Sequence, residues 1–142
     1  DFQPKDDVLP TLKRLLARSL PLLCVNPDFE VVKIDGTHML CAGVVAQIYE
    51  EMGGVVYRIG KPYPHVYKQV LAFLDLPPSR IVAFGDGPAT DIKGANRAGI
   101  DSVLITGGIL SAGHPGIGEA EARDLCEKEG AQPTYVMDGF RL

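Results

Sequence analysis

Apolar residues along the chain recur at two spacings, which predict helices alternating with short strands. Between residues 8 and 16 they fall three or four positions apart, as on one face of a helix, and Asp6 and Asp7 precede them at the expected helix start. Pro10 would then fall in the first turn, where its missing N–H costs little. Further helices are predicted over residues 42–52, 65–74, 92–99 and 119–129. Extended runs predict strands over residues 22–25, 29–34, 55–59, 81–84, 101–106 and 134–137.

The order of these elements indicates an α/β fold. Strand and helix alternate with short connections over most of the chain, as in parallel βαβ units. The helix over residues 65–74 carries an apolar face made of Val66, Val70, Phe73 and Leu74. Near residues 58–61 the chain passes into a second series of strands and helices, so we expect a domain boundary there.

Composition and charge narrow the class of protein. Of the 142 residues, 46% are apolar and 23% are charged, which indicates a packed core and not a disordered chain. The net charge is −4 and no basic patch stands out, so a nucleic-acid partner is not expected. The apolar stretch over residues 15–25 is interrupted by Arg18, Ser19 and Pro21, so no membrane span is predicted either.

Cysteine and tyrosine side chains indicate no site of their own. Cys24, Cys41 and Cys126 are odd in number and lie in apolar or helical stretches. We therefore predict buried free thiols in a reducing compartment, the cytoplasm. Tyr63 and Tyr67 are interpreted as packing residues.

Two carboxylates stand at the end of a predicted buried strand. Asp86 and Asp91 follow the apolar run over residues 81–84, and open α/β sheets bind their ligands at the carboxyl ends of such strands. Carboxylate oxygens suit Mg²⁺, which takes only one or two protein carboxylates and keeps several waters. Gly85 and Gly87 let the backbone approach a substrate phosphate closely. The alternative is a loop aspartate followed by an aspartate that caps a helix.

A lysine precedes these carboxylates by one predicted helix and one predicted strand. Lys61 lies between Gly60 and Pro62, directly after a buried strand, where the backbone is stiff and the ammonium can be aimed. An ammonium there could neutralise a phosphate as a point charge. Lys61 alone could be an ordinary surface lysine, but a lysine followed in this order by the two aspartates is a more specific signal of a phosphate site.

These motifs, together with residues 94–100 and 106–108, resemble the C-terminal half of a haloacid dehalogenase (HAD) superfamily phosphatase. The branch they resemble is the NagD-like, p-nitrophenyl-phosphatase-like one. Residues 26–28 and 41–43 are similar to segments of the α/β cap domain of that branch. The resemblance implies a partial α/β cap over residues 1–58. Over residues 59–142 it implies the C-terminal part of a Rossmann-like core with a parallel sheet.

The resemblance also implies roles for individual residues. Lys61 would steady the substrate phosphate and the nucleophile, and Asp86 would ligate Mg²⁺. Asp91 would hold either the waters of the metal or Lys61. Asn26 and Asp28 would lie on the cap and face the substrate.

Phosphatases of this kind attack phosphorus with an aspartate and form an aspartyl-phosphate, while Mg²⁺ neutralises the phosphoryl oxygens. The family carries the nucleophile in an Asp-x-Asp strand near its N-terminus, and no Asp-x-Asp occurs in this sequence. Residues 33–37 resemble that motif with Lys33 in place of the nucleophile, and a lysine cannot form an acyl phosphate. We predict instead that Asp35 and Gly36 form a turn within the cap.

The resemblance therefore predicts a Mg²⁺-dependent phosphomonoester hydrolase for a small phosphorylated metabolite, with its nucleophile strand outside this chain. One alternative is an inactive fragment, or a module of the same fold that binds phosphate or metal. A remoter alternative is a Rossmann-type nucleotide-binding module, which nucleotides would stabilise without Mg²⁺.

We expect the isolated chain to be marginally stable or to self-associate. A core sheet without its first strands leaves an apolar strand edge open, and open edges pair with other chains. Sedimentation equilibrium combined with a thermal melt measures both properties. A sharp two-state melt of a monomer would contradict this expectation.

Overall fold

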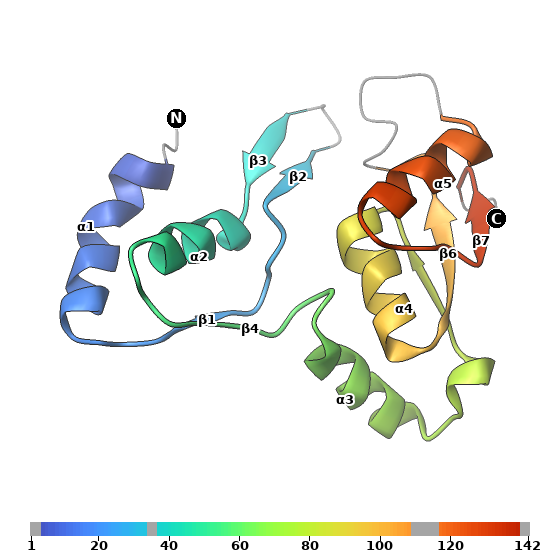
Figure 1. Ribbon diagram of the computed structural model, residues 1–142, viewed down its shortest axis with the longest axis horizontal. Helices are drawn as coiled ribbons and strands as arrows, with labels where there is room; N and C mark the ends of the chain where they lie inside the picture. Colours follow the sequence, from blue (N-terminus) through green and yellow to red (C-terminus); the bar gives the residue numbers. More distant parts are fainter. Residues whose placement is uncertain (1–3, 34–36, 109–116, 140–142) are drawn as a thin grey trace. The chain divides into compact units, whose positions relative to one another are not determined.

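The computed structural model describes residues 4–33, 37–108 and 117–139 (Figure 1). It divides into two compact units, Asp1–Gly60 and Lys61–Leu142. The interpretation of these units as part of a cap and part of a core stays a prediction. None of the helices in the described part of the chain has the length and hydropathy that a membrane crossing requires.

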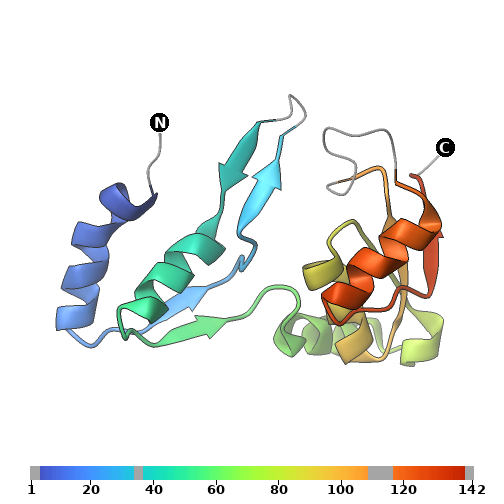
Figure 2. The same ribbon diagram turned by 45° about the horizontal axis from the view of Figure 1, so that its top comes forward.

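In its described residues, the first unit combines two helices with two pairs of short strands. Its elements are α1 (Pro4–Ala17), β1 (Leu22–Cys24), β2 (Glu30–Val32), β3 (His38–Leu40), α2 (Ala42–Glu51) and β4 (Val56–Arg58). Strands β1 and β4 are parallel, with Leu22 opposite Val56. Helices α1 and α2 lie side by side (Figure 2) and bury Leu12 and Tyr49 in one apolar cluster. The Tyr49 hydroxyl donates to the carbonyl of Leu20 at 2.5 Å, so this buried polar group is satisfied.

Helix α1 begins earlier than predicted. It starts at Pro4, so Pro10 lies inside the helix, and the prediction of a first-turn position was wrong. A proline at the first helical position already has the helical φ and loses no hydrogen bond, which explains the earlier start. Pro10 removes one backbone hydrogen bond, and packing of the buried Leu12 against α2 opposes that loss.

The segment that resembles a nucleophile motif lies between two strands that pair antiparallel. Strands β2 and β3 pair with Val32 opposite His38, and the Lys33 N–H donates to the carbonyl of Thr37 at 2.9 Å. The predicted turn residues Asp35 and Gly36 lie outside the described residues. Because the strands on either side run antiparallel, this segment does not end a parallel core strand as the family's nucleophile motif would.

The second unit is built on a parallel sheet of order β5-β6-β7. Its elements are α3 (Pro64–Leu74), η1 (Pro78–Arg80), β5 (Val82–Gly85), η2 (Pro88–Ile92), α4 (Lys93–Ala98), β6 (Asp101–Ile105), α5 (Glu119–Lys128) and β7 (Tyr135–Met137). The middle strand β6 buries Ser102, Val103 and Leu104 in succession, as expected for a strand covered on both faces. Leu104 packs with Ile92 and Cys126 in the core of this unit. The predicted α/β class with a parallel sheet is confirmed.

Helix α3 forms where its apolar spacing predicted, but most of its apolar face is exposed in this unit. Phe73 is 87% exposed, and Val70 and Leu74 are also exposed. No residue of α3 is buried. The spacing of apolar residues identifies the apolar face of a helix, but whether another element covers that face depends on the tertiary arrangement.

The three cysteines are free thiols, as predicted. Cys24 and Cys126 are buried, whereas Cys41 is only half-buried, so the prediction of burial was wrong for Cys41. Cys41 stands directly before α2, between the exposed residues Leu40 and Ala42. Burial raises the pKa of Cys126, which keeps this thiol protonated.

Leu104→Ala should lower the free energy of unfolding by about 2–5 kcal/mol, because it leaves a cavity in the fully buried core. Leu74→Ala is the matched control, since this leucine is 41% exposed on α3 and should cost less than about 1 kcal/mol. Urea denaturation followed by circular dichroism measures both values. Equal losses for the two variants would contradict the core described here.

Candidate active site

The turn after β5 is wide and is closed by a single carbonyl group. The carbonyl of Gly87 accepts the N–H groups of Thr90, Asp91 and Ile92 at 3.3, 2.8 and 3.2 Å. The segment Pro88–Ile92 is therefore a π-helical turn, a conformation that often occurs at functional sites. It carries Asp91, a nearly buried carboxylate with 9% of its surface exposed.

Both carboxylate oxygens of Asp91 have partners. The Lys61 ammonium donates to Oδ1 at 2.6 Å, and the backbone N–H of Gly87 donates to Oδ2 at 3.0 Å. The side chain of Lys61 is 46% exposed, whereas that of Asp91 is 11% exposed. Lys61 and Asp91 are 30 residues apart in the chain, and the fold brings them into a charge-assisted hydrogen bond.

Glycine at position 85 makes room for this carboxylate. A Cβ on Gly85 would overlap the side chain of Asp91, and one on Gly87 would overlap the hydroxyl of Thr90. The last residue of β5 therefore has to lack a side chain if Asp91 is to face Lys61. Gly85 and Gly87 thus hold Asp91 in place. The predicted contact of Gly87 with substrate stays a prediction.

Asp86 lies at the carboxyl ends of two neighbouring strands. A Cβ on Gly108 would overlap the carboxylate of Asp86, so this side chain packs against the residues that follow β6. Gly107 is fixed there by its N–H, which donates to the carbonyl of Asp138 at 3.0 Å. Strands β5 and β6 are parallel neighbours, so their ends meet at one edge of the sheet.

A hard cation such as Mg²⁺ fits this edge by ligand chemistry. Asp86 offers carboxylate oxygens, and Mg²⁺ needs only one or two protein carboxylates. Within the described ranges, no three His, Cys, Asp or Glu side chains gather closely enough to hold a metal ion. A site centred on Asp86 would therefore rely on water and substrate oxygens for its other ligands.

Tyr67 contacts this site in a way that the sequence did not indicate. Its hydroxyl donates to the carbonyl of Asp91 at 3.4 Å, and a Cβ on Gly94 would overlap that hydroxyl. Burial raises the pKa of Tyr67, and the negative charge of Asp91 raises it further. Gly94 is the sequence signal that could have revealed this contact, because its missing side chain leaves room for the ring.

Asn26 and Asp28 lie in the first unit, in the loop after β1. The Oδ1 atom of Asn26 accepts the backbone N–H of Asp28 at 3.3 Å, and its carbonyl accepts a hydrogen bond from Cys24 Sγ at 3.3 Å. Pro27 between them is buried. The side chain of Asn26 thus stabilises a turn. The predicted role of both residues in substrate binding stays a prediction.

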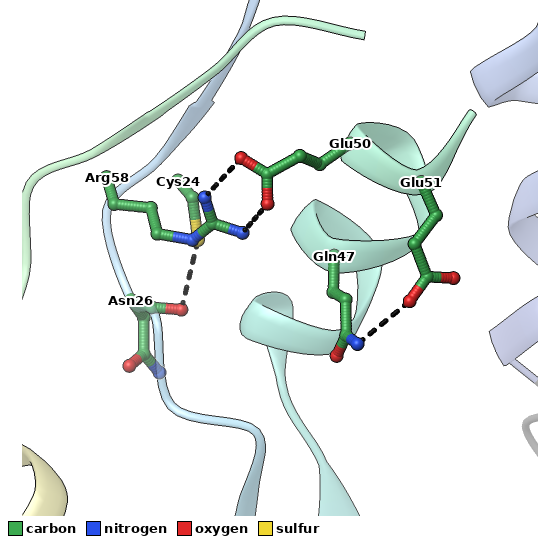
Figure 3. A network of polar contacts seen from close by, with 6 residues as sticks. All are labelled: Cys24, Asn26, Gln47, Glu50, Glu51 and Arg58. Atoms are coloured by element: carbon green, nitrogen blue, oxygen red, sulfur yellow. Dashed lines mark hydrogen bonds and ion pairs between the residues drawn. The ribbon is translucent and has the colours of Figure 1, made fainter. Parts of the chain in front are cut away.

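An ion pair stands beside this loop. Arg58, the last residue of β4, donates from two nitrogens to the carboxylate of Glu50 on α2, at 3.1 and 3.0 Å. Figure 3 shows this pair next to Cys24, with the side chain of Asn26 directed away from it. The hydrogen bond and charge of Arg58 lower the pKa of Glu50. The ion pair joins α2 to β4 and so stabilises the part of the first unit from which this loop extends.

The chain matches the models of two known protein families. Residues 1–99 match the family model described as haloacid dehalogenase-like hydrolase, and residues 58–141 match the one described as HAD-hydrolase-like. The chain belongs to the haloacid dehalogenase-like hydrolases. The family that the motifs resembled is therefore confirmed.

Curated relatives include two named phosphatases. The chain is 29% identical over 134 residues to dihydroxyacetone phosphatase of Corynebacterium glutamicum, a match that covers 94% of this chain and 45% of that protein. It is 25% identical over 105 residues to ribonucleotide monophosphatase NagD of Escherichia coli, which covers 74% of this chain and 41% of that protein. The chain thus spans about half the length of the relatives it matches.

Solved structures share the fold at similar coverage. A haloacid dehalogenase-like hydrolase from Brucella suis is 30% identical, with a TM-score of 0.76 over 99% of this chain and 51% of that chain. The p-nitrophenyl phosphatase from Archaeoglobus fulgidus is 22% identical, with a TM-score of 0.69 over 89% of this chain and 46% of that chain. A glycerol phosphate phosphatase from Mycobacterium tuberculosis, solved in complex with magnesium, is 22% identical with a TM-score of 0.67, over 93% and 36%.

Gly85→Ala should displace Asp91 from Lys61, because the added Cβ needs the space of the carboxylate. Overpacking of this kind lowers the free energy of unfolding by about 1–3 kcal/mol, which urea denaturation measures. Gly139→Ala is the matched control, since a Cβ there meets nothing within 4 Å. If both variants unfold with the same free energy, the packing around Asp91 is contradicted.

Proposed function

We propose that this chain supplies the metal-binding and lysine-bearing part of a phosphomonoester hydrolase that acts on a small phosphorylated metabolite. The observation that carries the proposal is the bond of 2.6 Å between Lys61 and Asp91 in the same unit as Asp86. The names of the relatives support it, because dihydroxyacetone phosphatase and ribonucleotide monophosphatase NagD both remove phosphate from small molecules.

Lys61 would neutralise charge on the phosphoryl group. Its ammonium is held by Asp91, and the Lys61 side chain is 46% exposed, so a substrate phosphate could approach this residue. An ammonium that is fixed before substrate arrives needs little reorganisation during the reaction. Asp91 would act through Lys61, by setting the direction of the ammonium group.

Asp86 would hold Mg²⁺ with its carboxylate. A neighbour in fold was solved in complex with magnesium, which supports this choice of cation. When bound, Mg²⁺ would stabilise negative charge on the phosphoryl oxygens. Asp86 would position the ion at the edge where β5 and β6 end, and Gly108 leaves room for that carboxylate.

The family chemistry requires an aspartate that attacks phosphorus and forms an aspartyl-phosphate, with the alcohol oxygen leaving as it gains a proton. No Asp-x-Asp occurs in this sequence. The proposal therefore assigns charge neutralisation, metal binding and positioning to these residues, and does not assign the nucleophile to any of them. The free thiols of Cys24 and Cys126 support a reducing compartment, which we propose is the cytoplasm.

The full-length gene product should hydrolyse p-nitrophenyl phosphate with Mg²⁺ and lose that activity in EDTA. Asp86→Asn should lower kcat by about a hundredfold, which is the scale on which one preorganised electrostatic group acts. Asp124→Asn is the matched control, because Asp124 is exposed on α5. Release of p-nitrophenol measures turnover, and titration calorimetry measures Mg²⁺ affinity.

Two outcomes would count against this function. Unchanged Mg²⁺-dependent turnover in Asp86→Asn would remove Asp86 from the metal site. No turnover by the full-length product, with Mg²⁺ binding retained, would favour the alternative of a binding module with the same fold.

A further inference from the structure

Tyr67 contacts the turn that carries Asp91 from outside that turn. Its hydroxyl donates to the carbonyl of Asp91 at 3.4 Å and occupies the space next to Gly94, where no Cβ fits. Tyr67 lies on α3, and Gly94 lies in the first turn of α4. The hydroxyl therefore links the helix that follows Lys61 to the turn that carries its partner.

The turn over Pro88–Ile92 needs such a link. Three N–H groups share the single carbonyl of Gly87, so these hydrogen bonds do not have the one-to-one pairing of a regular helix. The side chain of Asp91 is fixed by Lys61, whose position also depends on the segment that leads into α3. The same segment of chain thus holds Asp91 twice, at its carboxylate and at its carbonyl.

We propose that Tyr67 is a positioning residue, whose hydroxyl fixes the turn of Asp91 so that this carboxylate can direct Lys61. Its effect on catalysis rests on the function proposed above, whereas its effect on the turn does not. Tyr67 contacts the site through the backbone of Asp91, so it acts on the reaction only by way of the Lys61–Asp91 pair.

Two properties suit Tyr67 to this task. Its ring packs closely against Gly94 on α4, which leaves room for it by having no side chain, and its hydroxyl donates to the carbonyl of Asp91. Burial and the nearby Asp91 raise the pKa of Tyr67, so the hydroxyl remains protonated and able to donate at neutral and mildly alkaline pH.

The test compares Tyr67→Phe with Tyr135→Phe in the full-length gene product. Tyr67→Phe keeps the ring and removes only the hydroxyl, while Tyr135 is an exposed tyrosine on β7 and serves as the matched control. Hydrogen exchange measured by NMR follows the amides of Gly87 and Asp91, which close the turn. Steady-state hydrolysis of p-nitrophenyl phosphate gives kcat and KM separately.

In Tyr67→Phe both amides should exchange about two- to tenfold faster, the effect of losing one net hydrogen bond. The value of kcat should fall by a similar factor, while KM changes less than about twofold, because a loosened Lys61 keeps its charge but loses its position. Tyr135→Phe should change neither quantity.

Unchanged exchange at both amides in Tyr67→Phe would overturn the proposal, whatever happens to kcat. A rise in KM at constant kcat would overturn it too, because that result indicates a substrate contact. If the wild-type protein shows no turnover, the function proposed above fails, and the exchange rates still decide the role of Tyr67.

Discussion

The second unit depends on how one nearly buried carboxylate is satisfied. A buried carboxylate is costly unless it is paired and hydrogen-bonded, and Asp91 obtains Lys61 on one oxygen and the N–H of Gly87 on the other. This arrangement requires that β5 ends in a residue without a side chain, which is Gly85. It also requires that the chain before α3 returns to the end of β5. The turn, Gly85 and Lys61 therefore all serve to stabilise one nearly buried negative charge.

A second carboxylate, that of Asp86, is close to Asp91 in the sequence but has a different environment at the edge of the parallel sheet. Asp86 precedes the turn and packs against Gly108 at the end of β6, whereas Asp91 is buried within the turn. Two aspartates five residues apart can thus differ in role. Asp91 is paired with the ammonium group of Lys61, whereas Asp86 is the residue proposed to hold a metal ion.

Local patterns predicted most of the elements, though not β3 (His38–Leu40), and they did not predict how the elements are covered. The helix of α3 appeared where its spacing predicted, yet Phe73 and Val70 are exposed in the unit that contains them. Helix α1 begins before Asp6 and Asp7, the predicted start, because Pro4 suits a first helical position. For α3 the missing information is tertiary, since burial depends on packing partners that are distant in the chain. For α1 it is local, since the start follows from Pro4.

The amino-acid sequence by itself determined the α/β class, the parallel βαβ units of the second half and the candidates Lys61, Asp86 and Asp91, because these follow from local spacing and from the order of motifs. Tertiary structure decided which distant groups meet: that Lys61 bonds Asp91, and that the Tyr67 hydroxyl donates to a backbone carbonyl. Contacts between residues some 30 positions apart leave no local pattern. They arise only when the strands and helices pack.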